Sequence, residues 1–303
     1  MAHMVTTTDI RRRFVTIAGQ RVSYLEADRG HAGPTLVFVH GSGVSARYWS
    51  DQLHALAGTA RVLALDLPGH GESDAPPAPS LAQYASVTAR LLDDLGAWPA
   101  IVIGHSLGGA VAITLAAERP NAVSGLVLLS ACACLPPMST SAQWLWGALP
   151  ATLRRVLFFV TAKNVLFAAG ASPAAIALGM QELRACRPTT IAADVAIARS
   201  MDVSGLAATL RVPTLILCGS RDRVTPPDLA RRLHATIAGS ALQIVDGAGH
   251  MLLIEAAGVV NRAIAGFAGA VAQRRASPAI ARAAPSARWR RALRRLAGVL
   301  LRR

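Results

Sequence analysis

A serine flanked by glycines marks the first place in this sequence where chemistry could occur. Residues 104–108 read Gly-His-Ser-Leu-Gly and directly follow the apolar run 101–103. A serine in a tight turn between a strand and a helix projects its hydroxyl above the sheet edge, and glycines two residues away allow the strained backbone to fit. The same pattern also occurs in glycine-rich turns whose serine only caps a helix, so Ser106 needs partners before it is interpreted as a nucleophile.

Two later loops supply partners of the right kind. Asp222 follows the apolar run 214–219, and His250 lies in the glycine-rich segment 246–251. A histidine can take the proton of a serine hydroxyl near neutral pH, and an aspartate bonded to the other ring nitrogen fixes the tautomer and stabilises the imidazolium. We therefore predict that Ser106 is the nucleophile, His250 the general base and Asp222 the carboxylate that orients the base.

Three such side chains meet at one edge only if the strands before them run in the same direction. Short β-like runs alternate with longer helix-like stretches, and the later runs are continuously apolar, as strands covered on both faces are. The first two runs suit an antiparallel hairpin around Gly19. The predicted fold class is α/β, with a mostly parallel eight-stranded sheet, helices on both faces and an inserted helical cap. The expected strands span residues 14–17, 21–26, 35–40, 61–65, 100–104, 126–130, 214–219 and 242–245.

One stretch interrupts the alternation of strands and helices. Residues 135–203 contain no convincing strand, but they carry apolar helix-like segments separated by prolines. They are about twice as long as one crossover connection needs. We interpret them as the helical cap, inserted into a core of residues 5–134 and 204–271, with residues 272–303 forming a basic tail. A pair of ordinary crossover helices is the alternative.

Apolar side chains of the cap, together with residues beside the motifs, could enclose a substrate. Stripes of apolar residues on helices also arise from ordinary packing, so the lining is a hypothesis. A medium-chain or aromatic acyl group would fit such a pocket. The expected lining residues are Gly43, His105, Trp144, Trp146, Phe158, Phe159 and Met251.

The net charge of +14 suggests a nucleic-acid partner until its distribution is considered. Ten of the 31 basic residues lie in residues 272–303, which hold no acidic residue, and the other 21 exceed the 17 acidic residues by four. No basic stripe interleaved with aromatic residues precedes the tail, so we predict no nucleic-acid partner. The tail places Trp289, Leu293, Leu296 and Leu300 at helical spacing among arginines. That pattern predicts either weak contact with an anionic membrane surface or a solvated segment.

The rest of the sequence favours chemistry without a cofactor. The four cysteines lack the paired spacing of a zinc site, and neither a phosphate-binding loop nor a dinucleotide fingerprint is present. No apolar leader opens the sequence and no apolar run is long enough to cross a bilayer, although the opening Met-Ala-His-Met could replace a native leader. We therefore predict no metal, no organic cofactor, reduced thiols and a cytoplasmic location.

Taken together, these motifs resemble the α/β-hydrolase fold superfamily across residues 14–271. The chain order serine, aspartate, histidine is that of the superfamily. Residues 66–73 resemble its loop after the fourth strand, and residues 249–255 resemble its histidine segment. The motifs are highly specific for the fold and much less specific for the substrate.

The resemblance also indicates where an oxyanion would be bound. In this fold the turn after the third strand supplies one N–H, which we assign to Ser42, with Gly43 as the alternative. Leu107, at the start of the helix after the nucleophile, supplies the other N–H. His40, which opens the turn, is expected to orient it.

The activity implied is that of a serine hydrolase that cleaves a carboxylic ester, a lactone or a thioester with an apolar acyl group, through an acyl-enzyme. Epoxide hydrolases and haloalkane dehalogenases carry aspartate in place of Ser106, and haloperoxidase-like relatives carry an aromatic residue in place of Ser42. Carbon–carbon bond hydrolases of ring-cleavage products stay as an alternative, although Met251 stands where they usually have tryptophan. A ligand receptor or carrier using the capped pocket is the non-enzymatic alternative.

Overall fold

Eight strands form one sheet at the centre of the protein. The computed structural model describes residues 9–27, 33–137 and 149–276. The strand order is β1-β2-β4-β3-β5-β6-β7-β8; β2 pairs antiparallel with β1 and β4, and all later pairs are parallel. The mostly parallel eight-stranded sheet and its hairpin at Gly19 are thereby confirmed. The strands are β1 (Arg11–Ile17), β2 (Gln20–Ala27), β3 (Thr35–Val39), β4 (Arg61–Leu65), β5 (Ala100–His105), β6 (Val123–Leu129), β7 (Thr214–Gly219) and β8 (Ala241–Val245).

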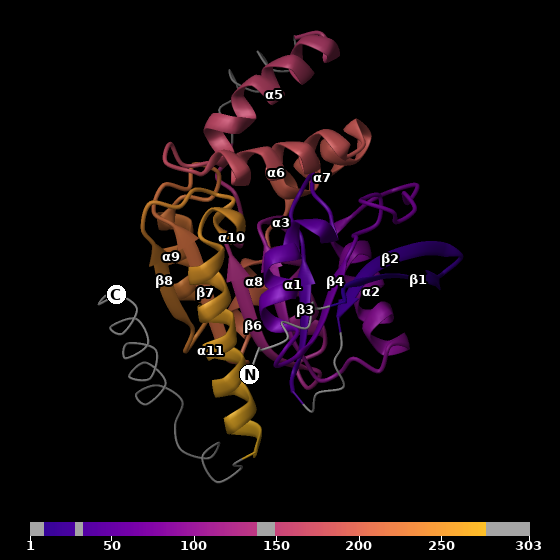
Figure 1. The fold of residues 1–303 in the computed structure, drawn as a ribbon, viewed down its shortest axis with the longest axis vertical. Helices are drawn as coiled ribbons and strands as arrows, with labels where there is room; N and C mark the ends of the chain where they lie inside the picture. The colour runs from indigo at the N-terminus through magenta and orange to yellow at the C-terminus, as the bar shows by residue number, and fades with distance from the viewer. Residues whose placement is uncertain (1–8, 28–32, 138–148, 277–303) are drawn as a thin grey trace, which may run out of the picture.

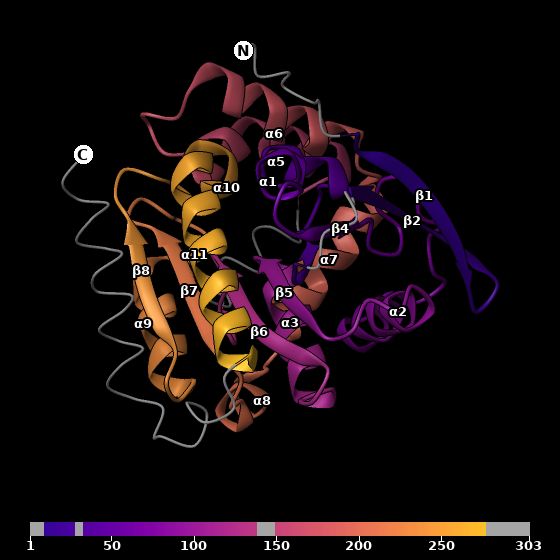
Figure 2. The same ribbon diagram turned by 60° about the horizontal axis from the view of Figure 1, so that its bottom comes forward.

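Helices cover both faces of this sheet (Figure 2). One face packs against α2 (Leu81–Asp94), α3 (Leu107–Glu118), α8 (Ser204–Thr209) and α9 (Pro227–Thr236). The other face packs against α1 (Ser50–Leu56) and α11 (Ala257–Ala276), which are joined to the sheet by the short helices η1 (Ala46–Trp49) and α10 (Leu252–Glu255). Alternate residues of a strand therefore enter two separate cores, one around Tyr84 and one around Trp49 and Phe267.

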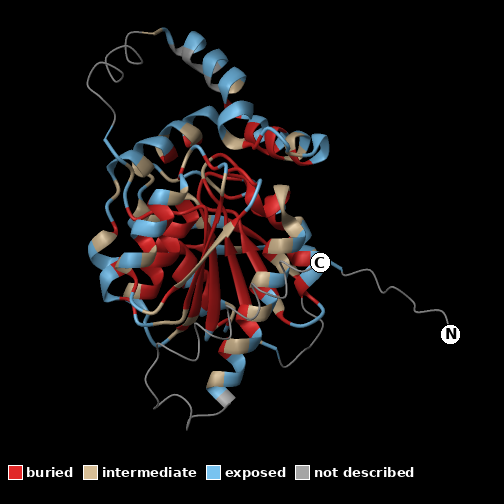
Figure 3. Ribbon diagram, turned by 90° about the vertical axis from the view of Figure 1, so that its left-hand side faces the viewer, coloured by how far each residue is buried: buried red, intermediate tan, exposed pale blue. Residues whose placement is uncertain are grey.

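Three of the helices between β6 and β7 lie above the sheet (Figures 1 and 3). They are α5 (Ala151–Leu166), α6 (Pro173–Ala185) and α7 (Pro188–Ser200). Pro188, which the sequence suggested as an interruption, is the first residue of α7, where its missing N–H costs nothing. The helix-like residues 144–148 and the tail from residue 277 onward lie outside the described residues.

The elbow, as we call residues 104–108, depends on close backbone packing. A Cβ atom on Gly104 would lie 2.3 Å from the carbonyl oxygen of Gly108, and a Cβ atom on Gly108 would lie 2.3 Å from that of Val39. Backbone atoms cannot rotate away as a flexible side chain can. Glycine at both positions therefore allows β5, α3 and β3 to meet closely enough to form the elbow.

Alanine at Gly108 is expected to destabilise the protein by about 1–3 kcal/mol, because α3 must move away from the end of β3. Gly58→Ala is the matched control, since a Cβ atom there meets nothing within 4 Å. Its effect should stay within about 0.5 kcal/mol. Urea unfolding of the two variants measures the difference, and equal stabilities would contradict this account of the packing.

Candidate active site

Ser106 occupies a strained turn between β5 and α3. Its backbone angles are φ 52° and ψ −119°, a region that side chains other than glycine rarely adopt. Two hydrogen bonds hold the residue there: its N–H donates to the carbonyl of Leu129 at 3.0 Å, and its carbonyl accepts from the N–H of Gly109 at 2.8 Å. Ser106 is half-buried, so a substrate can reach its hydroxyl. Strain of this kind costs about 1–3 kcal/mol and collects at functional sites.

Asp222 and His250 form a hydrogen-bonded pair at the carboxyl ends of β7 and β8. The Nδ1 atom of His250 lies 3.1 Å and 3.0 Å from the two carboxylate oxygens. The backbone N–H groups of Val224 and Thr225 donate to Oδ1 of Asp222 at 2.9 and 2.8 Å, and the Thr225 hydroxyl donates to Oδ2 at 2.9 Å. Nδ1 of His250 therefore carries the proton, which leaves Nε2 as the basic nitrogen.

The environment of Asp222 keeps it ionised. Its burial alone would raise the pKa, but the neighbouring His250 ring and the donated hydrogen bonds outweigh burial and lower the pKa of Asp222 to about 2. An aspartate that stays charged can stabilise a positive imidazolium when the histidine takes a proton. Thr225, which sequence reasoning missed, is part of this arrangement.

His250 is fixed through its backbone as well as its ring. Its N–H donates to the carbonyl of Leu166, the last residue of α5, at 2.9 Å. Its own carbonyl lies 3.0 Å from Nε2 of His105. Burial, reinforced by the nearby His250, lowers the pKa of His105 to about 3, so the His105 ring is neutral and donates from Nε2. A helix of the predicted cap and the residue before Ser106 thus position the histidine loop together.

Ser106 follows β5, at the same edge of the sheet as this pair. The ring of His105, its chain neighbour, is 5.0 Å from the ring of His250 between centroids. In the part of the chain that the structure describes, the Ser106 hydroxyl makes no hydrogen bond to His250. Catalytic hydrogen bonds are often long without substrate and shorten in the complex. The three predicted residues thus share one edge of the sheet, with the histidine–aspartate pair already formed.

The oxyanion turn, as we call residues 40–43, lies against the elbow. A Cβ atom on Gly41 would lie 3.0 Å from Cβ of Ser106. Nδ1 of His40 is 2.8 Å from the carbonyl oxygen of Gly41, and Nε2 of His40 accepts from the N–H of Leu67 at 3.0 Å. Because the Gly41 carbonyl and the Ser42 N–H belong to one trans peptide group, His40 sets the direction of that N–H.

The two amide donors considered for this turn differ in what they contact. The N–H of Gly43 donates to Asp194 at 3.3 Å, so it already has an acceptor. Ser42 is half-buried at the tip of the turn. Leu107 is the first residue of α3, where an N–H has no acceptor within the helix. These contacts favour Ser42 over Gly43 as the partner of Leu107.

The residues predicted to line a pocket lie in different places. His105 and Met251 are buried in the core, where both contact Tyr48. Gly43 lies beneath α6 and α7, and Phe159 is half-buried in α5 against the core around Trp49. Trp144, Trp146 and the side chain of Phe158 lie outside the described part of the chain.

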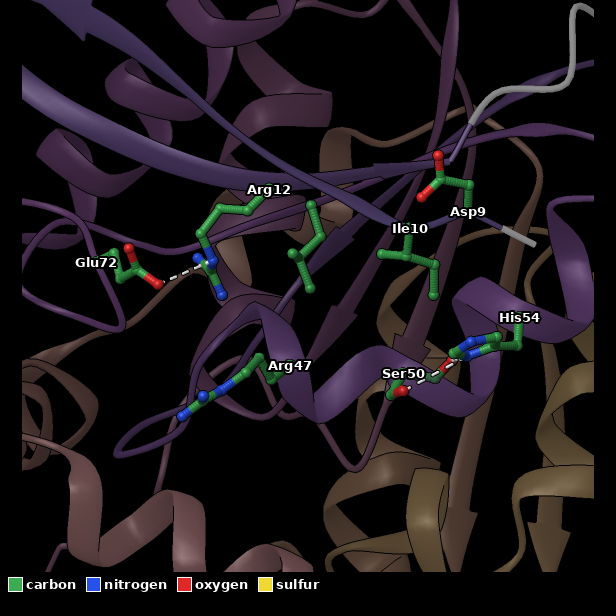
Figure 4. A pocket seen from close by; sticks show the side chains of 8 residues that line it. Asp9, Ile10, Arg12, Arg47, Ser50, His54 and Glu72 are labelled. Carbon is green, nitrogen blue, oxygen red and sulfur yellow. Dashed lines mark hydrogen bonds and ion pairs between the residues drawn. The ribbon is translucent and has the colours of Figure 1, made fainter. Parts of the chain in front are cut away.

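A groove of about 630 Å³ lies on another part of the surface (Figure 4). Its wall includes Arg12 and Glu72, which form an ion pair, and Ser50 and His54, whose side chains contact each other. None of the predicted catalytic or oxyanion residues belongs to it. Its eight lining residues are Asp9, Ile10, Arg12, Leu25, Arg47, Ser50, His54 and Glu72.

Residues 9–27, 33–137 and 149–276 contain no group of three or more histidine, cysteine, aspartate or glutamate side chains that could hold a metal ion. Among the helices in these ranges, none combines the length and the apolar character needed to cross a membrane.

Comparison with known proteins agrees with the fold. A thermophilic esterase from Thermogutta terrifontis superimposes with a TM-score of 0.75 at 26% identity, over 86% of this chain and 99% of that one. A pimeloyl-[acyl-carrier protein] methyl ester esterase of Neisseria meningitidis is 30% identical over 70% of this chain and 69% of the relative. The sheet, its helices and these neighbours define an α/β hydrolase.

The family follows from the sequence match. The model of the Alpha/beta hydrolase family matches residues 36–263, and the chain belongs to this family. A relative from Cupriavidus necator, the dihydrolipoyllysine-residue acetyltransferase component of an acetoin cleaving system, is 42% identical over 39% of this chain. The match spans only 31% of the length of that relative.

Proposed function

We propose that the protein hydrolyses a carboxylic ester, or a related lactone or thioester, through an acyl-enzyme formed on Ser106. The observation that carries the proposal is the buried His250–Asp222 pair at the edge of the sheet where the elbow presents Ser106. Esterases are among the family members that resemble the chain, and it is an enzyme of the ester-acting hydrolase class. We also propose the type of bond that is cleaved, the reaction steps and the class of substrate.

The first half of the reaction acylates the serine. The Ser106 oxygen bonds to the substrate carbonyl carbon while its proton passes to Nε2 of His250, and Asp222 stabilises the imidazolium. The oxyanion that forms accepts hydrogen bonds from the amides of Ser42 and Leu107. The carbon–oxygen bond to the leaving alcohol then breaks, and the alcohol takes its proton from His250.

The second half returns the enzyme to its starting state. A water molecule gives a proton to His250 and bonds to the acyl carbon, which forms a second oxyanion held by the same amides. The bond to Ser106 breaks, Ser106 regains the proton from His250, and the carboxylic acid leaves. The reaction involves no oxidation or reduction, and water is the only co-reactant.

The residues above the oxyanion turn support an apolar acyl group as the substrate. Cδ1 of Leu183 in α6 lies 2.7 Å from the place a Cβ atom on Gly43 would occupy, and Cγ1 of Ile191 in α7 lies 3.6 Å from it. Aliphatic side chains thus stand beside the oxyanion turn, and we propose that they contact the acyl chain of the substrate. We propose that residues 135–203 form a cap whose helices α6 and α7 provide this wall.

The location of the protein and its partners are proposed as well. We propose a cytoplasmic location, which is supported by four free cysteines, Cys132, Cys134, Cys186 and Cys218. A nucleic-acid partner is not proposed. Contact with an anionic membrane surface through residues 277–303 concerns a segment outside the described residues.

A panel of p-nitrophenyl esters from acetate to octanoate, with lactones and thioesters of matched acyl length, tests the function. We expect kcat/KM to rise with acyl length and to be highest for medium chains, since the wall of Leu183 and Ile191 gains contact with each added methylene. Ser106→Ala is the blank. The proposal is wrong if no substrate is hydrolysed above this blank and a fluorophosphonate fails to label Ser106. Hydrolysis of a ring-cleavage diketone alone would instead support carbon–carbon bond cleavage.

A further inference from the structure

Asp194, on α7, is a buried carboxylate that the proposed reaction does not use. It is fully shielded from solvent, yet it accepts hydrogen bonds from three separate parts of the core. The donors are Nε2 of His70 at 2.8 Å, the hydroxyl of Tyr84 at 2.9 Å and the backbone N–H of Gly43 at 3.3 Å. A carboxylate is costly to bury, so such a site exists only where donors surround it.

These donors connect the predicted cap with the oxyanion turn. Tyr84 comes from α2, and His70 comes from the loop after β4. Burial raises the pKa of the Tyr84 hydroxyl, and the Asp194 charge raises it further, so this hydroxyl keeps its proton and donates it. Gly43 is the last residue of the oxyanion turn, so the third donor joins Asp194 directly to the segment that carries the Ser42 amide.

The turn is held from two sides. On one side, His40 fixes the Gly41 carbonyl at 2.8 Å, and the ring of His40 packs against that of His70, with centroids 4.7 Å apart. On the other side, Asp194 fixes the Gly43 N–H at 3.3 Å. Gly43 has a φ of 74°, a backbone conformation that glycine adopts readily. Because glycine has no side chain, the turn is not held in place by a side chain at this position. The Ser42 N–H belongs to the peptide group of the Gly41 carbonyl, and Asp194 holds the peptide group that directly follows it.

We propose that Asp194 is a positioning residue for the oxyanion turn, so that the seating of α7 on the core sets the direction of the Ser42 amide. This inference rests on the proposed serine-hydrolase function. The donor that stabilises an oxyanion must be aimed before the reaction begins, and a small misplacement lowers the rate without much effect on substrate binding. In this protein, a residue of the predicted cap orients the Ser42 amide.

Glu182 provides the matched comparison, because it anchors the same region without touching the amides of the turn. It is a buried carboxylate of α6 that accepts from the Ser45 hydroxyl and forms an ion pair with Arg47 at 3.3 Å. If Asp194 only tied the cap to the core, the loss of either carboxylate would affect catalysis alike. If Asp194 positions the turn, only its own loss would lower kcat.

The experiment compares Asp194→Ala and Asp194→Asn with Glu182→Gln, using the best ester of the wild-type enzyme. In Asp194→Ala we expect kcat to fall by about 10- to 100-fold with KM within about threefold. Asp194→Asn should regain most of this loss, because its amide oxygen can still accept from Gly43 while its NH₂ group faces Tyr84. The control, Glu182→Gln, should keep kcat within about threefold of wild type.

A second measurement reports on the turn without catalysis. Hydrogen exchange of the Gly43 amide, followed by ¹⁵N NMR, should be at least about tenfold faster in Asp194→Ala than in wild type and unchanged in Glu182→Gln. If Asp194→Ala does not fold, Asp194→Ser carries the same expectations, since its side chain is too short to reach Gly43.

The outcomes separate this inference from the proposed function. An active wild type whose Asp194→Ala variant loses no more kcat than Glu182→Gln, or loses affinity instead, overturns the positioning role alone. Unchanged exchange at Gly43 in Asp194→Ala does the same. A wild-type protein that hydrolyses no ester and resists fluorophosphonate overturns the proposed function, and the positioning role with it.

Discussion

Ser106→Ala is expected to lower kcat for ester hydrolysis by about a million-fold, to the level that binding and the oxyanion donors alone support. The loss is so large because the proposed acyl bond forms on the Ser106 oxygen, which alanine lacks. Fold and stability should be unaffected: the Ser106 hydroxyl makes no hydrogen bond among the described residues, so the free energy of unfolding should change by less than about 0.5 kcal/mol. Burst kinetics and mass spectrometry of the fluorophosphonate adduct measure the chemistry.

Ser50→Ala is the control for this substitution. Ser50 is the first residue of α1, its side chain contacts His54 of the same helix, and it lines the groove to which none of the predicted catalytic residues belongs. It should keep full activity and full labelling by the fluorophosphonate. Residual hydrolysis in Ser106→Ala within tenfold of wild type would show that another residue is the nucleophile.

Asp222→Asn should give the second largest effect, a fall in kcat of about ten-thousand-fold. Asparagine can donate a hydrogen bond to Nδ1 of His250, and the ring would then carry its proton on Nε2, where it cannot accept the proton of Ser106. The neutral asparagine side chain also cannot stabilise an imidazolium by its charge. Asp228→Asn, an exposed change in α9, is the control and should retain wild-type kcat. A loss of less than about tenfold in Asp222→Asn would contradict the role of Asp222 as the orienting carboxylate.

The same aspartate should make stability depend on pH. Its pKa is lowered to about 2 in the folded protein, so its stabilising contribution is present above the unfolded value near 4 and is lost as pH falls from about 4 towards 2. The contribution is on the order of 2 kcal/mol. Urea unfolding of wild type and Asp222→Asn at pH 6 and pH 2.5 checks it: the difference in unfolding free energy should shrink on acidification. A difference that stays constant would contradict the low pKa.

Local sequence patterns were sufficient for the sheet and for the positions of Ser106, Asp222 and His250. Continuous apolar runs mark strands buried on both faces, and Gly104 and Gly108 are needed where backbones nearly touch. These signals lie within a few residues of each feature. The parallel topology then places all three catalytic candidates at one edge, which is why their proximity followed from chain order.

Contacts between distant segments could not be predicted in this way. In the sequence, Asp194 is a single acidic residue in an apolar helix. The only indication of its role is that an acidic side chain, if buried, needs hydrogen-bond partners. Nothing in the sequence indicates that those partners are His70 and Tyr84. Pro188 separates two helix-like segments, as the sequence predicts, and its exact place as the first residue of α7 comes from the structure. His105 is buried, and its contacts with Tyr48 and with the carbonyl of His250 could not be predicted from its position next to Ser106.

The long segment between β6 and β7 also affects the stage of folding at which activity can appear. β6 ends at Leu129 and its direct neighbour β7 begins only at Thr214, so the two strands pair after a large loop has closed. Closing such a loop costs entropy before any contact between the strands is gained. During synthesis the residues of the elbow therefore precede Asp222 and His250, so the proposed nucleophile exists before its proposed base. We expect ester hydrolysis to appear only after β7 and β8 have joined the sheet, which would make activity a reporter of that strand pairing.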